Sequence, residues 1–174
     1  MVTLPKLHPI FYIMTFDLRP FLKKLAVFFG AGYSPKAPGT VGTLATIPLY
    51  WLLMQAGPLF YMSFVVFLLP LAILAAEVYE QEMQRHDSSE IVIDEVLGFL
   101  ITMTWLPLTW QAVTLGFFIF RFLDILKPFP IGYLDKKISG GLGVVADDVA
   151  AGILGNIFLQ LINNQTTWLQ MKWF

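Results

Sequence analysis

The sequence predicts an all-α integral membrane protein, a polytopic bundle of about five (four to six) transmembrane helices with an N-terminal interfacial helix. The composition is the first reason: 57% of the 174 residues are hydrophobic and only 13% are charged. The mean hydropathy of +0.69 lies outside the range of ordinary soluble domains. The second reason is that the charged residues are confined to residues 6–36, 77–95 and 121–148 and to Lys172.

The uncharged stretches between these clusters divide into predicted spans. Gly57-Pro58 is a turn signal within the first stretch, and Pro107 lies between Trp105 and Trp110, which are typical of a membrane interface. Residues 21–29 carry Lys23 and Lys24 and are predicted to form the interfacial helix. The predicted spans are residues 41–55, 58–77, 91–106, 108–126 and 148–162.

We expect one membrane-embedded domain, residues 1–174. Residues 1–36 form its cytoplasmic or interfacial N-terminal segment, and residues 41–162 form its transmembrane catalytic bundle. Five spans bring all three charged clusters to one face of the membrane and leave Lys172 on the other. Because the clustered face holds nearly all of the lysines and arginines, the positive-inside tendency places it in the cytoplasm.

Composition also excludes several kinds of site. A formal net charge of -1 gives no basic excess for binding a nucleic acid. The absence of cysteine excludes disulfides, thiolate metal sites and cysteine nucleophiles. The two histidines, His8 and His86, are too few for a histidine-rich zinc site.

Acidic residues in apolar surroundings are the main indication of chemistry. Asp94 and Glu95 open the third predicted span, Asp147 and Asp148 open the last, and Asp124 lies at the cytoplasmic end of the fourth. The structural alternative is that the two acidic pairs lie at helix N-termini, where the helix macrodipole stabilises negative charge by about 0.3 to 1 kcal/mol. Five converging carboxylates would repel one another unless a cation neutralised them, so the combination favours a site.

Arg121 lies three residues before Asp124 and projects from the same helical face. Its structural interpretation is an intrahelical ion pair. Carboxylate oxygens without thiolate or imidazole suit a hard cation, Mg²⁺ first, with Ca²⁺ and Mn²⁺ as alternatives. Because Mg²⁺ commonly binds substrate phosphate as well, a phosphate-bearing substrate is expected.

Basic and glycine-rich segments supply the expected anion-binding groups. Residues 30–43 contain Lys36 and Thr40 in a loop that leads into the first span. Such a loop suits phosphate, although an ordinary interfacial turn is the commoner explanation. Lys127 is the better candidate for phosphate contact, whereas Lys136 and Lys137 suit anionic lipid headgroups.

Four segments together resemble the bacterial phosphatidylglycerophosphatase A family, in order and in separation. They are "SPKAPGTVGTLATIPL", "IVIDEVLGF", "FRFLDILKPFPIGYLD" and "SGGLGVVADDVAAGI", and the resemblance covers residues 30–155. It implies a Mg²⁺-dependent phosphatase of the bacterial inner membrane, with its active site on the cytoplasmic face. The implied reaction removes the terminal phosphate of phosphatidylglycerophosphate to give phosphatidylglycerol.

The resemblance also implies roles for individual residues. Arg121 and Lys127 would be catalytic groups that stabilise the transferring phosphate, and Asp94 or Asp148 would be the general base. A mechanism through a covalent aspartyl-phosphate is the second alternative. His86 and Asp87, which precede the acidic segment of residues 91–99, are a further match to the family. The implied metal ligands are Asp94, Glu95, Asp124, Asp147 and Asp148, and the implied phosphate-binding residues are Lys36, Thr40, Arg121 and Lys127.

Other functions remain as alternatives. A divalent-cation transporter also places carboxylates in membrane helices, but the distal halves of the spans carry no charge to form a path. Another membrane enzyme that handles phosphate, or a structural scaffold, is also open, although a scaffold leaves the five carboxylates unexplained. Gly98, Gly152 and Gly155 suit close helix packing, either within one chain or in a homo-oligomer.

Overall fold

The computed structural model describes residues 18–84 and 88–171, and every regular element in them is helical. The predicted all-α fold class is confirmed for this part of the chain. In chain order, with η for a 3-10 helix, the elements are α1 (Arg19–Ala26), η2 (Phe28–Tyr33), α2 (Pro38–Gln55), α3 (Pro58–Met83), α4 (Ile93–Thr102), α5 (Trp110–Leu126), α6 (Ile131–Lys137), α7 (Gly141–Gln165) and η3 (Trp168–Gln170).

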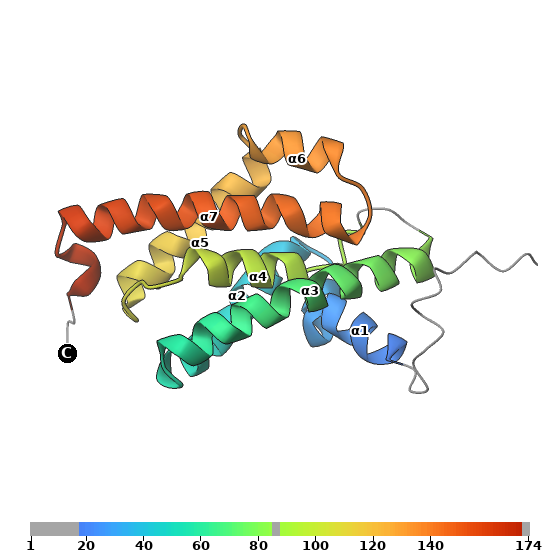
Figure 1. Ribbon diagram of the computed structural model, residues 1–174, viewed down its shortest axis with the longest axis horizontal. Coiled ribbons are helices and arrows are strands. Elements are labelled where there is room, and N and C mark those ends of the chain that lie inside the picture. Colours follow the sequence, from blue (N-terminus) through green and yellow to red (C-terminus); the bar gives the residue numbers. More distant parts are fainter. Residues whose placement is uncertain (1–17, 85–87, 172–174) are drawn as a thin grey trace, which may run out of the picture.

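Helix α4 is the centre of the bundle. Figure 1 shows it between α7 on one side and α2 and α3 on the other, and it also contacts α5. Eight of its ten residues are buried. The ring of Phe99 in α4 lies 6.5 Å from that of Tyr50 in α2 and 6.4 Å from that of Phe120 in α5. The core therefore forms around the segment that carries Asp94 and Glu95.

The predicted break at Gly57-Pro58 is confirmed. Gly57 has a φ of 96°, which an L side chain rarely adopts, and Pro58 is the first residue of α3. Helix α3 continues to Met83, beyond the predicted end at residue 77, so Glu77, Glu80 and Glu82 lie on the helix. The second charged cluster thus begins on a helix rather than in a loop.

The predicted helix over residues 91–106 is too long. Helix α4 ends at Thr102 and is about 15 Å long at 1.5 Å per residue, half of the ~30 Å hydrocarbon core. A side chain of α7 explains why α4 can end at Thr102. The Asn156 side chain donates hydrogen bonds to the carbonyls of Thr102 at 2.9 Å and Thr104 at 2.8 Å, which satisfies this helix end from outside.

Helix α7 begins earlier than predicted, at Gly141 instead of Asp148. The N–H of Gly141 donates to Glu77 Oε2 of α3 at 2.7 Å, so a side chain distant in sequence caps the helix. Gly140, with a φ of 74°, makes the turn into it. Asp147 and Asp148 consequently lie in the second turn of α7, and its first turn has no acidic residue.

The predicted helix over residues 21–29 is shifted. Helix α1 covers Arg19–Ala26 and ends because Phe28 and Phe29 have left-handed backbone, with φ of 41° and 54°. It packs against α3, where Lys23 Nζ lies 2.5 Å from Glu82 Oε2. This hydrogen-bonded ion pair raises the pKa of Lys23.

Two helices in the described residues, α3 and α7, are long and apolar enough to cross a membrane. Their most apolar windows have mean hydropathies of 2.4 and 1.6. Many large apolar side chains are also exposed, which is unusual for a soluble monomer and indicates membrane association. Examples are Trp51, Leu59, Phe60, Val66, Phe67, Trp105, Phe118, Phe122 and Phe158.

The helices alternate in direction along the molecule. Figure 1 shows α2, α4 and α7 running one way and α3 and α5 running the other. The later part of α3 and the end of α5 therefore lie near the starts of α2, α4 and α7, and we call this region the charged end. At the uncharged end, residues 49–60, 100–112 and 160–171 contain no charged side chain.

Candidate functional site

Five carboxylates from three helices meet at the charged end. Asp94 and Glu95 lie in the first turn of α4, Asp124 lies in the last turn of α5, and Asp147 and Asp148 lie in the second turn of α7. Two groups have carboxylate oxygens within 4.8 Å of one another: Asp94, Glu95 and Asp148, and Asp124, Asp147 and Asp148. The structure thus brings together every residue that the sequence analysis named as a metal ligand.

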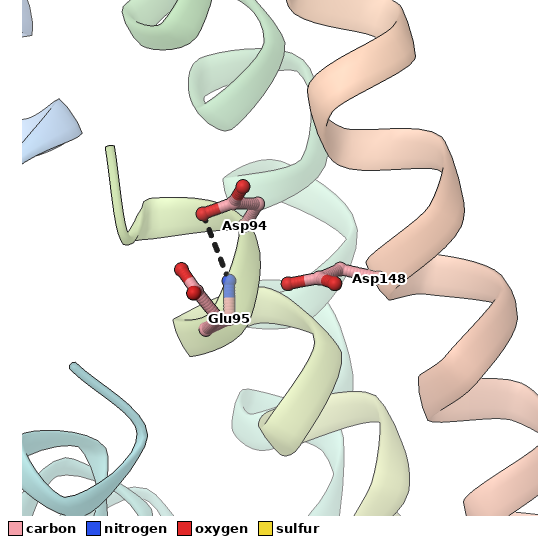
Figure 2. A group of neighbouring side chains, drawn as sticks. All are labelled: Asp94, Glu95 and Asp148. Carbon is pink, nitrogen blue, oxygen red and sulfur yellow. Dashed lines mark hydrogen bonds between the residues drawn. The ribbon is translucent and has the colours of Figure 1, made fainter. Parts of the chain in front are cut away.

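Figure 2 shows how the first group is arranged. Asp94 Oδ1 accepts a hydrogen bond from the N–H of Glu95 at 3.0 Å, which holds the Asp94 carboxylate over the start of α4. Asp148 projects from α7 toward both residues. Side chains from two helices therefore face a common space.

Glycines allow α4 and α7 to approach this closely. A Cβ on Gly152 would lie 2.5 Å from the carbonyl oxygen of Gly98, and one on Gly98 would lie 2.8 Å from that of Asp148. A Cβ on Gly155 would lie 3.3 Å from Thr102 Oγ1. All three glycines pack helices within one chain, which is one of the two arrangements expected from the sequence.

Arg121 joins α5 to α4. Its Nη1 lies 2.5 Å from Asp124 Oδ2, which is the intrahelical ion pair expected as a structural role, and also 3.5 Å from Glu95 Oε1. Because all three side chains are at most 14% exposed, these charges interact with little screening by water. Arg121 therefore belongs to the cluster as well as to its own helix.

Lys127 joins α5 to α7. It follows the last residue of α5 in left-handed backbone, with a φ of 42°, and its Nζ lies 2.6 Å from Asp147 Oδ2. The sequence indicates Lys127 as a candidate for phosphate contact and does not predict this ion pair. The spacing of Lys127 and Asp147 along the chain contains no signal for it, because the contact depends on how α5 meets α7.

The start of α2 closes another side of the cluster. A Cβ on Gly39 would overlap the Glu95 carboxylate and lie 3.0 Å from Arg121 Nη1. The sequence analysis gave Gly39 no role of its own. Thr40, the next residue, is half-buried in the first turn of α2, whereas Lys36 is exposed in the preceding loop. His86 and Asp87 lie outside the described residues.

Glu77 is a second residue that the sequence analysis missed. Its carboxylate accepts a hydrogen bond from the start of α7, and a Cβ on Gly141 would lie 2.6 Å from its backbone nitrogen. This contact fixes where α7 begins relative to α3. It thereby sets the position of Asp147 and Asp148, one and a half to two turns further along.

The burial of the acids distinguishes a site from helix capping. Asp94, Asp147 and Asp148 are 8%, 5% and 3% exposed. The helix macrodipole accounts for Asp94 and Glu95, which are in a first turn, but not for Asp147 and Asp148. Buried carboxylates are costly unless they are paired or bind a metal, and a set of carboxylate oxygens suits a hard divalent cation.

A comparison with protein families matches residues 24–163 to the model for phosphatidylglycerophosphatase A. The chain belongs to the phosphatidylglycerophosphatase A family. The resemblance inferred from the four segments is confirmed, and so is the predicted enzyme class, a phosphatase that acts on a phosphate monoester. Family membership thus favours the phosphatase over the transporter and the scaffold.

Similar proteins support this assignment. Phosphatidylglycerophosphatase A of Escherichia coli strain K12 is 42% identical over 142 residues, which cover 80% of this chain and 82% of that protein. Phosphatidylglycerophosphatase A of Haemophilus influenzae is 42% identical over 131 residues, 74% of this chain and 80% of that protein. A Bacteroides thetaiotaomicron protein, provisionally named phosphatidylinositol-3-phosphatase, is 34% identical over 139 residues, 75% of this chain and 86% of that protein. No solved structure matches.

Proposed function

We propose that this protein hydrolyses the terminal phosphate of phosphatidylglycerophosphate to give phosphatidylglycerol and phosphate. The observation that carries the proposal is the meeting of five carboxylates, Arg121 and Lys127 at one end of a bundle with an apolar surface. A phospholipid has the same division, with a charged phosphate at one end and apolar chains at the other. The similarity to the two phosphatidylglycerophosphatases supports this substrate.

Mg²⁺ is the proposed cofactor, held by Asp94, Glu95, Asp124, Asp147 and Asp148. The fit rests on the donor set and on Asp148 Oδ2 and Glu95 Oε2, which are buried and have no hydrogen-bond partner among the described residues. Mg²⁺ held there would supply positive charge that polarises the phosphate and would make a nearby water more acidic. The protein has to supply the geometry, and three rigid helices do so.

The basic residues are proposed to bind the phosphate. Arg121 and Lys127 flank the carboxylates and would stabilise negative charge on the phosphate oxygens during transfer. Because Gly39 has no side chain, the Glu95 carboxylate and Arg121 pack directly against the start of α2. Thr40 and Lys36, in and just before this turn, are proposed to bind the outer phosphate oxygens. Asp94 is the proposed acceptor of the proton of the attacking water.

The membrane arrangement follows from the same reasoning. Helices α3 and α7 would cross the inner membrane, with α2 and α5 completing a multi-pass bundle around α4. The charged end would lie at the depth of the cytoplasmic headgroups, where the positive-inside tendency places lysines and arginines. The substrate would then keep its acyl chains in the bilayer while its phosphate enters the site.

Phosphate release by the purified full-length protein tests the proposal. We expect release from phosphatidylglycerophosphate with Mg²⁺, little release after chelation, and a large loss for Asp94→Asn. Glu82→Gln is the control, because Glu82 is a half-exposed carboxylate that pairs with Lys23 outside the cluster. Full activity of Asp94→Asn would remove Asp94 from the site.

Substrate selectivity needs its own measurement because of the Bacteroides relative. We expect a higher kcat/KM for phosphatidylglycerophosphate than for phosphatidylinositol-3-phosphate in the same micelles. The reverse order would transfer the proposal to the inositol lipid. Acid quenching with radiolabelled substrate tests the chemistry: direct attack by water leaves no label on the protein, whereas trapped label would indicate an aspartyl-phosphate.

A further inference from the structure

We propose that the five carboxylates hold two divalent cations, with Asp148 as the ligand shared by both. The inference rests on the proposed function and deepens it, because it assigns the acids to two positions. The first position is formed by Asp94, Glu95 and Asp148, and the second by Asp124, Asp147 and Asp148.

The arrangement of the helices produces this overlap. The first position lies between α4 and α7, and the second lies between α5 and α7. Asp148 is the one residue common to the two groups found among the described residues. A carboxylate has two oxygens, and two-metal phosphatases hold their ions about 3.5–4 Å apart, a separation that one carboxylate can bridge.

An unpartnered buried oxygen points to a ligand independently of the clustering. Asp148 is 3% exposed, and its Oδ2 has no hydrogen-bond partner among the described residues. Figure 2 shows its carboxylate directed toward Asp94 and Glu95. Glu95 Oε2 is a second buried oxygen of this kind in the first position. Buried polar atoms of proteins are nearly always satisfied, so these two oxygens are explained by cations.

The charges indicate the number of cations. Carboxylates bind metal in their ionised form, and with all five ionised, Arg121 and Lys127 leave three negative charges in the cluster. One divalent cation would leave the site negative and repel a phosphate monoester, which carries about -1.5 to -2 at neutral pH. Two divalent cations make the site positive by one charge. Only the two-cation state therefore attracts the substrate electrostatically.

The two metal positions differ in how closely basic side chains contact their carboxylates. In the second position, Arg121 lies 2.5 Å from Asp124 and Lys127 lies 2.6 Å from Asp147. In the first position the contact of a basic side chain with Glu95 is longer, 3.5 Å. The first cation thus meets little competition, whereas the second has to displace Arg121 and Lys127. Displacement frees both side chains for phosphate, so the second cation and phosphate should bind with positive coupling.

Titration of the purified full-length protein with Mn²⁺, in detergent micelles and followed by electron paramagnetic resonance, tests the inference. We expect two Mn²⁺ per chain at saturation, bound in two steps. The second step should produce a spin-coupled signal, because a shared carboxylate links the ions. Inorganic phosphate should tighten the second step several-fold and leave the first unchanged.

Variants assign the two positions. Asp124→Asn should reduce the stoichiometry from two to one and abolish the coupled signal, while the first step keeps its affinity. Asp148→Asn should weaken both steps. If this variant does not fold, Glu95→Gln tests the first position and Asp124→Asn tests the second. Glu82→Gln should retain two coupled ions.

Some results would overturn the inference without affecting the proposed function. One Mn²⁺ per chain at saturation would disprove two positions, and two uncoupled ions would disprove the shared ligand. In either case hydrolysis of the lipid in the separate assay would leave the phosphatase assignment intact. Conversely, two coupled ions without lipid hydrolysis would support the metal assignment and contradict the substrate.

Discussion

The two ends of the helix bundle use polar side chains in opposite ways. At the uncharged end, neutral side chains donate to backbone carbonyls: Thr109 to Leu169 at 2.6 Å and Gln160 to Thr104 at 3.0 Å. At the charged end, carboxylates face one another, and Glu95 Oε2 and Asp148 Oδ2 are buried without hydrogen-bond partners among the described residues. One end is arranged for stability, and the other accepts unfavourable charge contacts that a ligand can relieve.

The uncharged end also has one such atom, because Gln111 Oε1 is buried and has no hydrogen-bond partner in residues 18–84 and 88–171. However, Gln111 is neutral, and its Nε2 donates to the carbonyl of Met171 at 3.0 Å. Leaving one amide oxygen unsatisfied costs much less than burying an uncompensated carboxylate. The difference between the ends is therefore one of charge, and it leads to four predictions of decreasing size.

The largest effect is expected for Asp148→Asn. Activity should fall about 100- to 1,000-fold, the range found when one electrostatic group is removed from an active site. The metal-free variant should melt at the same or a higher temperature than the metal-free wild type, because a buried charge is removed. Calorimetry with a chelator checks this, and a clear loss of stability would mean that Asp148 is mainly structural.

Gly152→Ala should lower both stability and activity. The added Cβ would lie 2.5 Å from the backbone oxygen of Gly98, which cannot rotate away, so α4 and α7 must separate. Overpacking of this kind costs about 1–3 kcal/mol, to be measured by unfolding in mixed micelles. Gly116→Ala is the control, because its Cβ would meet the flexible Met103 side chain. Equal activity losses in the two variants would contradict this explanation.

Asn156→Leu should act on stability alone. It removes the donor to both carbonyls and leaves that of Thr102 without its side-chain donor, whereas Thr104 keeps Gln160 as a donor. Leaving the buried Thr102 carbonyl unsatisfied should cost about 1–3 kcal/mol. Activity per folded molecule should stay near the wild-type value, since Asn156 lies two turns of α7 beyond Asp148. Quantitative folding and phosphate-release assays on the same sample separate the two effects. A lower kcat in a fully folded sample of this variant would contradict the division of roles between the charged and uncharged ends of the bundle.

The smallest effect is expected for Glu77→Ala, which removes the acceptor for the Gly141 N–H. By analogy with helix caps, the cost is about 0.5–2 kcal/mol. Glu77→Gln keeps an acceptor oxygen and should cost less. A modest fall in kcat that Glu77→Gln restores would identify Glu77 as a positioning residue for Asp147 and Asp148. Identical behaviour of the two variants would argue against that role.

The sequence was sufficient for features that depend on local signals or on simple counting. Gly57-Pro58 indicates the break between α2 and α3 through backbone preferences alone. Helices that alternate in direction bring the charged clusters to one end of the bundle, and Asp94, Asp124 and Asp148 indeed meet there. These predictions needed no knowledge of which side chains touch.

Features set by contacts between distant segments could not be predicted in this way. Helix α4 ends at Thr102 because Asn156 satisfies its carbonyls, and α7 begins at Gly141 because Glu77 accepts its N–H. The ion pair of Lys127 with Asp147 also depends on how α5 meets α7. In each case the deciding partner is a side chain from another helix, and no periodicity of the segment itself encodes it.

The short length of α4 has a consequence for how the enzyme is made. A helix of ten residues cannot cross a bilayer by itself, so α4 has to be held by the longer helices around it. One of these is α7, which is synthesised after α4 and α5 and brings Asp147 and Asp148 with it. Until α7 has been made, the growing chain therefore carries only part of its acidic cluster, and the two carboxylate groups that share Asp148 cannot form.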